Sequence, residues 1–194
     1  VLKSIENNDN ISVVSYLSDN DFDYLTGEKR EFVKTVLPII INENQKIIIT
    51  RDFLHNLKEK LRTFKTLNNK EILKLNDIAK KYNIKYSDKH KLDVINDILL
   101  NVDVIPNSIA LAQAAKESGW GTSRFALEGN AIFGQWTWDG QGIAPLKRDG
   151  DKNHKILKFP ILRASVKAYK NNLNTHKSYL KFREKRESLR GKDK

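Results

Sequence analysis

The sequence contains no cysteine, and this absence excludes several classes of site. Without thiols the chain has no disulfide framework and no thiolate metal site. The four histidines have no partner at the spacing that metal sites use, so we expect neither a metal ion nor another cofactor. The lack of cysteine is equally compatible with the cytoplasm and the periplasm.

Long apolar runs are missing as well. The longest runs from Val36 to Ile41 and contains Pro38, so it is far shorter than the roughly 20 residues of a membrane span. The 194 residues are enough for one compact domain with an N-terminal appendage. Because the chain begins at Val1 rather than Met, we expect a mature or trimmed chain whose signal peptide lies outside it.

The net charge of +11 is placed unevenly. Residues 140–194 contain 16 Lys and Arg against 5 Asp and Glu, whereas residues 1–139 contain 19 of each. A concentrated basic segment attracts polyanions, such as an anionic cell wall, a membrane surface or nucleic acid. We expect nucleic acid least, because no recognition motif accompanies the charge. A lysine-rich composition without a binding role remains the alternative.

The stretch 106–136 carries the clearest local signals. Pro106 and Ser108 predict a helix start, and the glycines on either side of Trp120 predict its end. Thr122 or Ser123 is then placed to cap a second short helix that ends near Gly129.

Glu117 lies in the last turn of the first of these helices. The negative end of the helix dipole disfavours a carboxylate there. Its helical neighbours are small, and Trp120 and Phe133 could exclude water from it. Both effects favour the protonated form, which a glycosidase needs in order to protonate a leaving oxygen. An ordinary surface glutamate paired with Lys116 or Arg124 is the alternative.

The run AQAAKESGWGTSRFALEGNAIFGQW resembles the Bax-like branch of the bacterial glucosaminidases, glycoside hydrolase family 73, related to flagellar muramidase domains. The resemblance extends more weakly from about Phe32 to about Leu189. It implies a mainly α (α+β), lysozyme-like fold in which a cleft separates a helical lobe from a small β-hairpin lobe. It also implies a periplasmic or cell-envelope enzyme that cleaves β-1,4 bonds in peptidoglycan glycan strands. The general acid would be Glu117, and the implied cleft residues are Trp120, Asn130, Phe133, Gly134 and Trp136.

The rest of the chain predicts mostly helices. We expect residues 1–25 to be a leader and residues 26–194 to be the glucosaminidase domain. One long or broken helix is predicted to about Phe64, with Pro38 kinking or ending it. Further helices are predicted over 71–82, 88–101 and from Ile161, with a break at Thr175 or Ser178 before a basic helix to about Arg190.

Residues 136–160 predict a β-hairpin or small sheet, with Arg148 to Asn153 near its turn. Most glycosidases use two catalytic carboxylates. This region contains no Glu, so the second catalytic carboxylate would be an aspartate. We favour Asp149 over Asp139 and Asp151, although a turn-forming role beside Gly150 explains it equally well.

The resemblance also implies a late tyrosine in the segment that closes the cleft. Tyr169 and Tyr179 are the nearest candidates, and we favour Tyr169 as a catalytic residue. The matching late segment falls beyond Lys194, which predicts that part of the C-terminal lobe lies outside this sequence. Attack by the substrate's own acetamido oxygen, or by a water held by Tyr or Asn, remains an alternative to a second carboxylate.

Aromatic and amide side chains complete the predicted substrate site. Trp136 could stack on sugar faces or lie in the core, Trp120 is expected in the core, and Trp138 is expected to be exposed. Gln113 lies one helical turn before Glu117 and is placed to hydrogen-bond it, although a satisfied core amide explains this residue equally well. The alternative function is a catalytically weak or degenerate glycan-binding domain.

Overall fold

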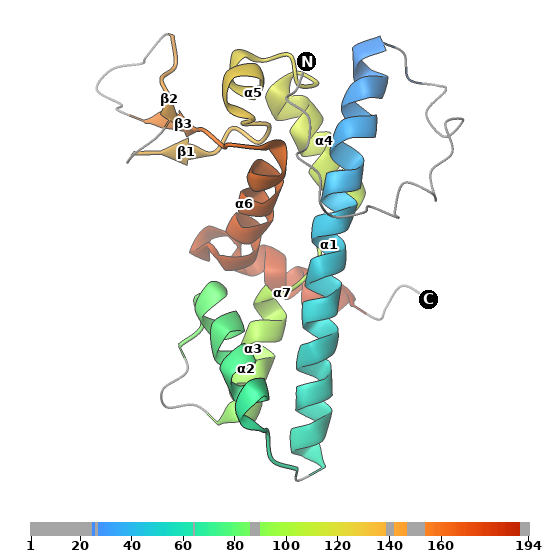
Figure 1. Ribbon diagram of the computed structural model, residues 1–194, viewed down its shortest axis with the longest axis vertical. Helices are drawn as coiled ribbons and strands as arrows, with labels where there is room; N and C mark the ends of the chain where they lie inside the picture. Colours follow the sequence, from blue (N-terminus) through green and yellow to red (C-terminus); the bar gives the residue numbers. More distant parts are fainter. Residues whose placement is uncertain are drawn as a thin grey trace. The chain divides into compact units, whose positions relative to one another are not determined.

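The computed structural model describes residues 25, 27–63, 65–85, 90–138, 142–146 and 154–190. Figure 1 shows a mainly helical chain with one small antiparallel sheet. The prediction of a mainly α (α+β), lysozyme-like fold is therefore confirmed. Among the described residues, no helix combines the length and the apolar character that crossing a membrane requires.

The helices follow the predicted order. They are α1 (Gly27–Arg62), α2 (Asn69–Lys81), α3 (Lys91–Asn101), α4 (Asn107–Ser118), α5 (Arg124–Gly129), α6 (Leu162–Thr175), the 3₁₀ turn η3 (Lys177–Tyr179) and α7 (Leu180–Leu189). The strands are β1 (Trp136–Thr137), β2 (Gly142–Ile143) and β3 (Lys155–Leu157). The predicted break between α6 and α7 thus falls at Thr175 and the turn that follows it.

Helix α1 continues through Pro38, so of the two predicted effects of this proline, a kink or an end of the helix, the end is wrong. A proline inside a helix removes one backbone hydrogen bond and costs about 3 kcal/mol. The side chains around it offset this cost, because Val36, Ile39 and Ile40 are all buried.

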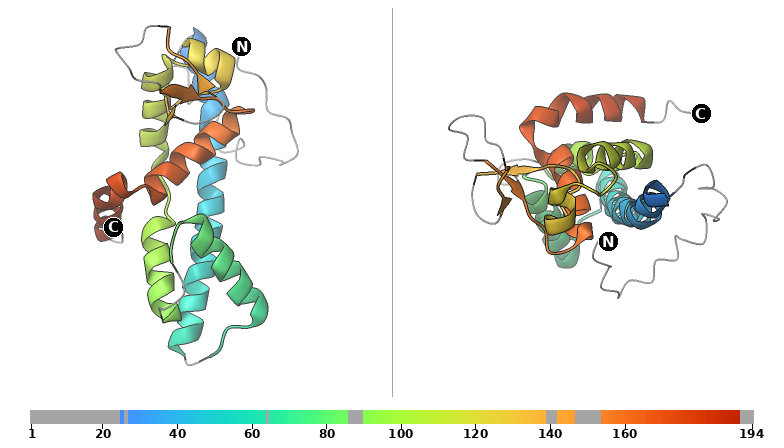
Figure 2. Two further views of the ribbon diagram at one scale, coloured as in Figure 1. Left: turned by 90° about the vertical axis from the view of Figure 1, so that its left-hand side faces the viewer. Right: turned by 90° about the horizontal axis from the view of Figure 1, so that it is seen from above.

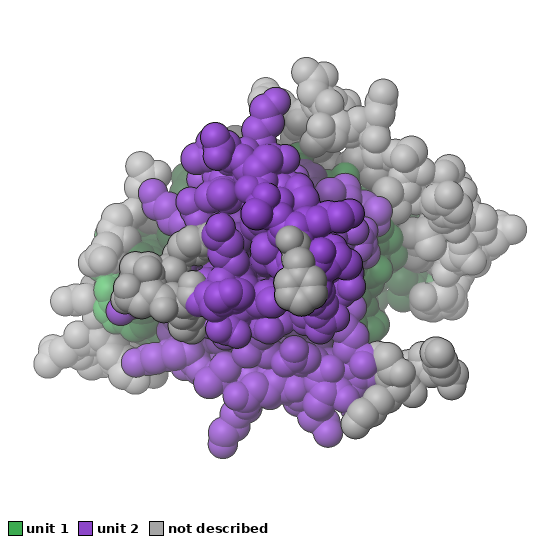
Figure 3. All heavy atoms as spheres, turned by 90° about the horizontal axis from the view of Figure 1, so that it is seen from below, with its two compact units in different colours: residues 1–43, 105–169 green, residues 44–104, 170–194 purple. Residues whose placement is uncertain are grey.

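The chain forms two compact units, which Figure 3 colours separately. Unit 1 contains residues 1–43 and 105–169, and unit 2 contains residues 44–104 and 170–194. Each unit takes one part of α1 and one part of α6. The division of the chain into a leader (1–25) and a domain (26–194) stays a prediction.

Unit 2 is built on an apolar core between α2, α3 and the second part of α1. Leu54, Leu75, Ile95 and Ile98 are fully buried in it. The start of α2 is fixed by a capping box, in which Asn68 accepts a hydrogen bond from the Glu71 N–H and Glu71 accepts one from the Asn68 N–H.

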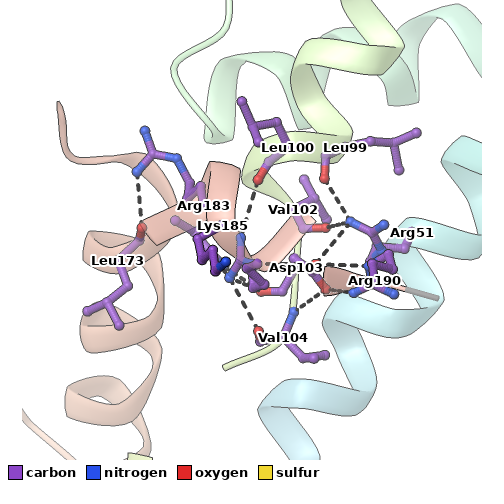
Figure 4. Close-up of polar contacts among 12 residues, drawn as sticks. Arg51, Leu99, Leu100, Val102, Asp103, Val104, Leu173, Arg183, Lys185 and Arg190 are labelled. Carbon is purple, nitrogen blue, oxygen red and sulfur yellow. Dashed lines mark hydrogen bonds and ion pairs between the residues drawn. The ribbon is translucent and has the colours of Figure 1, made fainter. Parts of the chain in front are cut away.

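A cluster of three arginines surrounds Asp103 in unit 2 (Figure 4). Arg190 Nε donates to Asp103 Oδ2 at 3.1 Å, and the Nη1 atom of Arg51 and the Nε atom of Arg186 lie 3.7 and 3.4 Å from the same oxygen. The arginines also neutralise the end of α3, where helix carbonyls lack intrahelical partners. Arg51 donates to Leu99 O at 2.7 Å and to Val102 O at 2.6 Å, and Arg186 donates to Leu100 O at 3.2 Å.

The arginine cluster changes the interpretation of the basic C-terminal segment. Arg183 is buried and donates to the carbonyl oxygens of Leu173 and His176. Burial lowers the pKa of Arg186 to about 10, with Asp103 opposing the shift. These charges therefore hold α7 within its own unit, whereas the lysines at 177, 181 and 185 are exposed. Binding of the basic C-terminal segment to an anionic surface stays a prediction. In α7, the exposed lysines rather than the arginines would make this contact.

Unit 1 contains the sheet, whose strand order is β1-β3-β2 with antiparallel pairing throughout. Trp136 pairs with Ile156, and Ile143 pairs with the same residue from the other side. The predicted small sheet is confirmed, and the expected turn at 148–153 lies outside the described residues. Figure 2 shows the strands beside α5, where a side chain at Gly129 would meet Ile143 Cδ1 at 2.7 Å.

Candidate functional site

Helix α4 and the turn after it form a rigid frame in unit 1. Gly119 ends the helix in the left-handed conformation, with φ of 57°. Ser118 Oγ donates to Ala114 O at 2.6 Å and accepts from the Gly121 N–H at 2.8 Å. Ser123 then caps α5 by accepting from the Ala126 N–H. The predicted helix start, stop and second cap are all confirmed.

Small side chains let α4 pack closely on one side and leave its other side open. Ala110, Ala114, Ala115 and Ser118 are buried, whereas Gln113 and Glu117 are exposed. The sequence Ala-Ala-Lys-Glu-Ser therefore directs Glu117 outward from a well-anchored helix end.

The carboxylate of Glu117 forms no hydrogen bond or ion pair with the residues that the structure describes. The alternative, a glutamate paired with Arg124, does not occur, because Arg124 contacts Glu128 at 3.4 Å and donates to Ala144 O at 2.6 Å. The expectation of a desolvated acid is wrong, since the side chain is exposed. The two aromatic residues that were expected to exclude water have other partners.

Trp120 and Phe133 both pack against other aromatic rings. Trp120 meets Phe32 of α1 edge-on, with ring centroids 5.8 Å apart. Phe133 is buried and stacks on Tyr169, with centroids 3.9 Å apart and an interplanar angle of 6°. Trp120 is half-buried rather than fully in the core, so that expectation is only partly met.

Gly134 lies next to the Glu117 carboxylate. A Cβ atom built on Gly134 would lie 3.7 Å from Glu117 Oε2. The glycine also has a φ of 57°, a conformation that side chains disfavour. The backbone of residue 134 thus comes close to the acid without a side chain in between.

Tyr169 reaches the same helix face from α6. Its hydroxyl donates a hydrogen bond to Oε1 of Gln113, one helical turn before Glu117. The expected hydrogen bond between Gln113 and Glu117 is therefore replaced by one to the tyrosine. The structure thus brings together Glu117, Gln113, Gly134, Phe133 and Tyr169. The Gln113–Tyr169 contact joins residues 56 positions apart, and no local pattern in the sequence indicates it.

Asn130 and the exposed tryptophans flank this group in the chain. Asn130 is buried in the left-handed conformation, and its amide donates to Phe159 O at 3.1 Å. Trp136 and Trp138 are 56% and 70% exposed, and Trp136 stacks on His154 with centroids 4.5 Å apart. Trp138 is exposed as predicted, and Trp136 is a surface residue rather than a core one.

The candidates for the second carboxylate, Asp139, Asp149 and Asp151, lie outside the described residues. Within the described ranges, no group of three or more His, Asp or Glu side chains is arranged to hold a metal ion. Tyr179, the other tyrosine considered, is an exposed residue of η3 in unit 2.

Similarity to known proteins agrees with these features. The family model described as Glucosaminidase, mannosyl-glycoprotein endo-beta-N-acetylglucosaminidase, matches residues 92–192. Protein bax of Escherichia coli (strain K12) is 37% identical over 169 residues, which are 87% of this chain and 58% of that protein. The chain therefore spans a little over half the length of this relative. No solved structure matches the chain significantly.

Proposed function

Because this chain belongs to the glucosaminidase family, we propose that it hydrolyses the β-1,4 glycosidic bonds of peptidoglycan as an endo-β-N-acetylglucosaminidase. Glu117 is the proposed general acid. The family supports a glycosidase that acts on a glycan. The choice of peptidoglycan, the bond and the acid are our proposal, and so is a location in the periplasm or cell envelope, where this substrate lies.

The observation that carries the proposal is the exposure of the Glu117 side chain and its lack of partners among the described residues. It is an exposed carboxylate at the end of a rigid helix, and its oxygens have no partner among the described residues. A carboxylate that is free of ion pairs can take up a proton and deliver it to a ligand. The backbone of Gly134 approaches this carboxylate with no side chain in between, and we propose that the sugar ring binds beside it.

The proposed reaction begins with a glycan strand bound beside Glu117. The bound sugar would shield the carboxyl group from water, and a shielded carboxyl group favours its neutral form. Glu117 then protonates the glycosidic oxygen as the bond from that oxygen to the anomeric carbon breaks. The departing sugar carries the proton away as a hydroxyl group, and Glu117 is left as a carboxylate.

A second group must stabilise or attack the anomeric carbon. Asp149 is the proposed carboxylate, with the acetamido oxygen of the substrate as the alternative. Tyr169 is the proposed helper for an attacking water. Its hydroxyl donates to Gln113, one helical turn before Glu117, and we propose that the tyrosine oxygen accepts a hydrogen bond from that water. Such a bond orients the water without removing a proton from the tyrosine.

The remaining predicted residues are proposed to hold the glycan. Trp136 offers an exposed aromatic face that the apolar side of a sugar ring could cover. Gln113 has a free amide NH₂ group, because only its oxygen is engaged by Tyr169. Phe133, Asn130 and Trp120 support the surrounding backbone and rings, and direct contacts from them to glycan stay predictions.

The test is digestion of purified peptidoglycan by the wild-type chain, Glu117→Gln and Glu128→Gln. Glu128 is the matched control, since it is another exposed glutamate, on α5. Reducing ends are counted and the products are identified by mass spectrometry after borohydride reduction. We expect N-acetylglucosaminitol ends from the wild type and Glu128→Gln, and a rate about 10²–10⁴-fold lower for Glu117→Gln.

Two outcomes contradict the proposal. Full activity of Glu117→Gln would exclude this residue as the acid. Retention of the wild-type chain on peptidoglycan without any release of reducing ends would favour the alternative, a glycan-binding domain that does not cut.

A further inference from the structure

A cavity of about 570 Å³ lies in unit 1, between the start of α1 and the turn that joins α4 to α5. Figure 1 shows the start of α1, the end of α4 and helix α5 at the same end of the picture. Two turns of α1, the α4–α5 turn and α5 contribute the lining residues Glu28, Glu31, Phe32, Thr35, Trp120, Gly121, Thr122 and Leu127. Glu117 is not among them, so the cavity is separate from the proposed catalytic acid.

The backbone hydrogens of the α4–α5 turn are not available to a ligand in this cavity, because the turn uses them internally. The Trp120 N–H donates to Ala115 O at 2.8 Å and the Thr122 N–H donates to Gly119 O at 3.2 Å. The Gly121 N–H donates to Ser118 Oγ at 2.8 Å. An anion would require donors of this kind, so the cavity does not suit one.

The hydroxyl hydrogens are also used within the chain. Thr35 Oγ1 donates to Glu31 O at 2.8 Å, and Thr122 Oγ1 donates to Gly119 O at 2.6 Å. Each hydroxyl therefore presents only acceptor lone pairs to a ligand. The carboxylates of Glu28 and Glu31 are exposed acceptors, and neither has a hydrogen bond or ion pair within the described part of the chain.

Aromatic and aliphatic surfaces complete the lining. Phe32 and the 52% exposed Leu127 are apolar, and Trp120 presents its indole ring. The Nζ atom of Lys29 lies 5.4 Å from the Trp120 ring centroid, so this ring already attracts one ammonium group of the chain. Acceptors, an aromatic face and apolar walls together match a ligand that has a positive head on an aliphatic stem.

We propose that this cavity binds a primary aliphatic ammonium group, such as the side chain of a lysine-like diamino acid in a peptide. The carboxylates of Glu28 and Glu31 receive the ammonium hydrogens, the Trp120 ring attracts its charge, and Phe32 and Leu127 contact the stem. As an extension that rests on the proposed function, the ligand is a peptide branch of the glycan strand. The cavity would then select strands that carry amine-bearing peptides.

Binding is tested on the full chain with Nα-acetyl-lysine amide as the probe. The sequence has three tryptophans, so the three indole N–H signals can be followed separately by NMR and assigned with single Trp→Phe variants. We expect the Trp120 signal to move with this probe while those of Trp136 and Trp138 stay in place. Nα-acetyl-norleucine amide, which has the stem without the amine, should leave all three unchanged.

Variants test the role of charge in the cavity. Glu28→Gln with Glu31→Gln should weaken binding by about tenfold. The control pair Glu59→Gln with Glu184→Gln, which removes two exposed glutamates elsewhere, should have no effect. Lys29→Gln should tighten binding, because it removes an ammonium group that competes for the ring. An equal response to norleucine amide, or weaker binding by Lys29→Gln, would overturn the proposal.

Digestion assays separate this inference from the proposed function. The Glu28→Gln/Glu31→Gln variant should raise the KM for glycan strands that carry amine-bearing peptides and leave the KM for peptide-free strands unchanged. Equal KM values for both would show that the cavity does not bind the peptide branch. If the wild type cuts neither substrate, the proposed function fails, and the NMR titration still decides whether the cavity binds an amine.

Discussion

Two acidic residues near helix ends have opposite surroundings. Asp103 follows α3, is 2% exposed, and is held by Arg51, Arg186 and Arg190. Glu117 is in the last turn of α4, is exposed, and has no partner among the described residues. A charge that is buried and surrounded by opposite charges stabilises a fold, whereas a charge left open is available to a ligand.

The comparison also explains the structural role of the arginines in the basic C-terminal segment. The arginines of α7 are held by Asp103 and by backbone carbonyls at the end of α3 and of α6. Nothing similar occurs around Glu117, although Arg124 lies in the next helix. Within the described part of the chain, arginine thus fixes unit 2 and does not pair with the proposed acid in unit 1.

The largest effect on stability is expected for Asp103→Asn. Removal of one partner of a buried ion pair leaves the other charge uncompensated and costs about 3–5 kcal/mol. The free energy of unfolding, measured by urea denaturation, should fall by this amount. Asp77→Asn, an exposed control in the same unit, should change it by less than about 0.5 kcal/mol. A small effect of Asp103→Asn would mean that the arginines are held mainly by the carbonyl oxygens.

A smaller loss of stability is expected for Gly134→Ala. Alanine is strained at a φ of 57°, which costs about 1–2 kcal/mol. Gly27→Ala is the matched control, because Gly27 has a φ of 55° and open space around it. Both variants should unfold more easily, and only Gly134→Ala should also lower kcat/KM on peptidoglycan. Equal kcat/KM values for the two would show that the space beside Glu117 is not used.

Tyr169→Phe should lower the free energy of unfolding by about 1 kcal/mol. The variant keeps the stacking on Phe133 and loses the hydrogen bond to Gln113. If the hydroxyl orients the attacking water, kcat should fall much more than stability does. Tyr179→Phe, an exposed tyrosine of η3, provides the control. A wild-type kcat for Tyr169→Phe would remove this residue from the proposed mechanism.

The smallest effect concerns the capping box of α2. Hydrogen bonds from Lys60 and from the Asn68 N–H lower the pKa of Glu71 below its ordinary value of 4.5. Because the pKa is lower in the folded state, Glu71 stabilises the fold above pH 4.5 and loses this contribution as the pH falls through the folded-state value. The difference in Tm between the wild type and Glu71→Gln should therefore shrink on acidification. A constant difference would show that the ionised carboxylate is not what stabilises the cap.

Local features of the sequence predicted most of the elements and the frame of the site. The stop at Gly119 and the cap at Ser123 depend on residues within a few positions of one another. The helix predicted from Ile161 corresponds to α6 for the same reason.

Long-range contacts explain what the sequence could not predict. Arg51 reaches carbonyls 48 and 51 positions away, and the Tyr169 hydroxyl reaches Gln113 over 56 positions. The direction of Trp120 depends on its own positive φ of 57° and on Phe32 in a distant part of the chain. The prediction that Trp120 and Phe133 desolvate Glu117 is wrong, because their rings pack against Phe32 and Tyr169 instead.

One variant, measured in two ways, tests the contrast between the exposed Glu117 and the buried Asp103 most directly. Glu117→Gln should keep the free energy of unfolding within about 0.5 kcal/mol of the wild type, because no described residue depends on this carboxylate. The same protein should release reducing ends from peptidoglycan about 10²–10⁴-fold more slowly. A folded Glu117→Gln protein with undiminished turnover, or one that unfolds as readily as Asp103→Asn, would contradict the account.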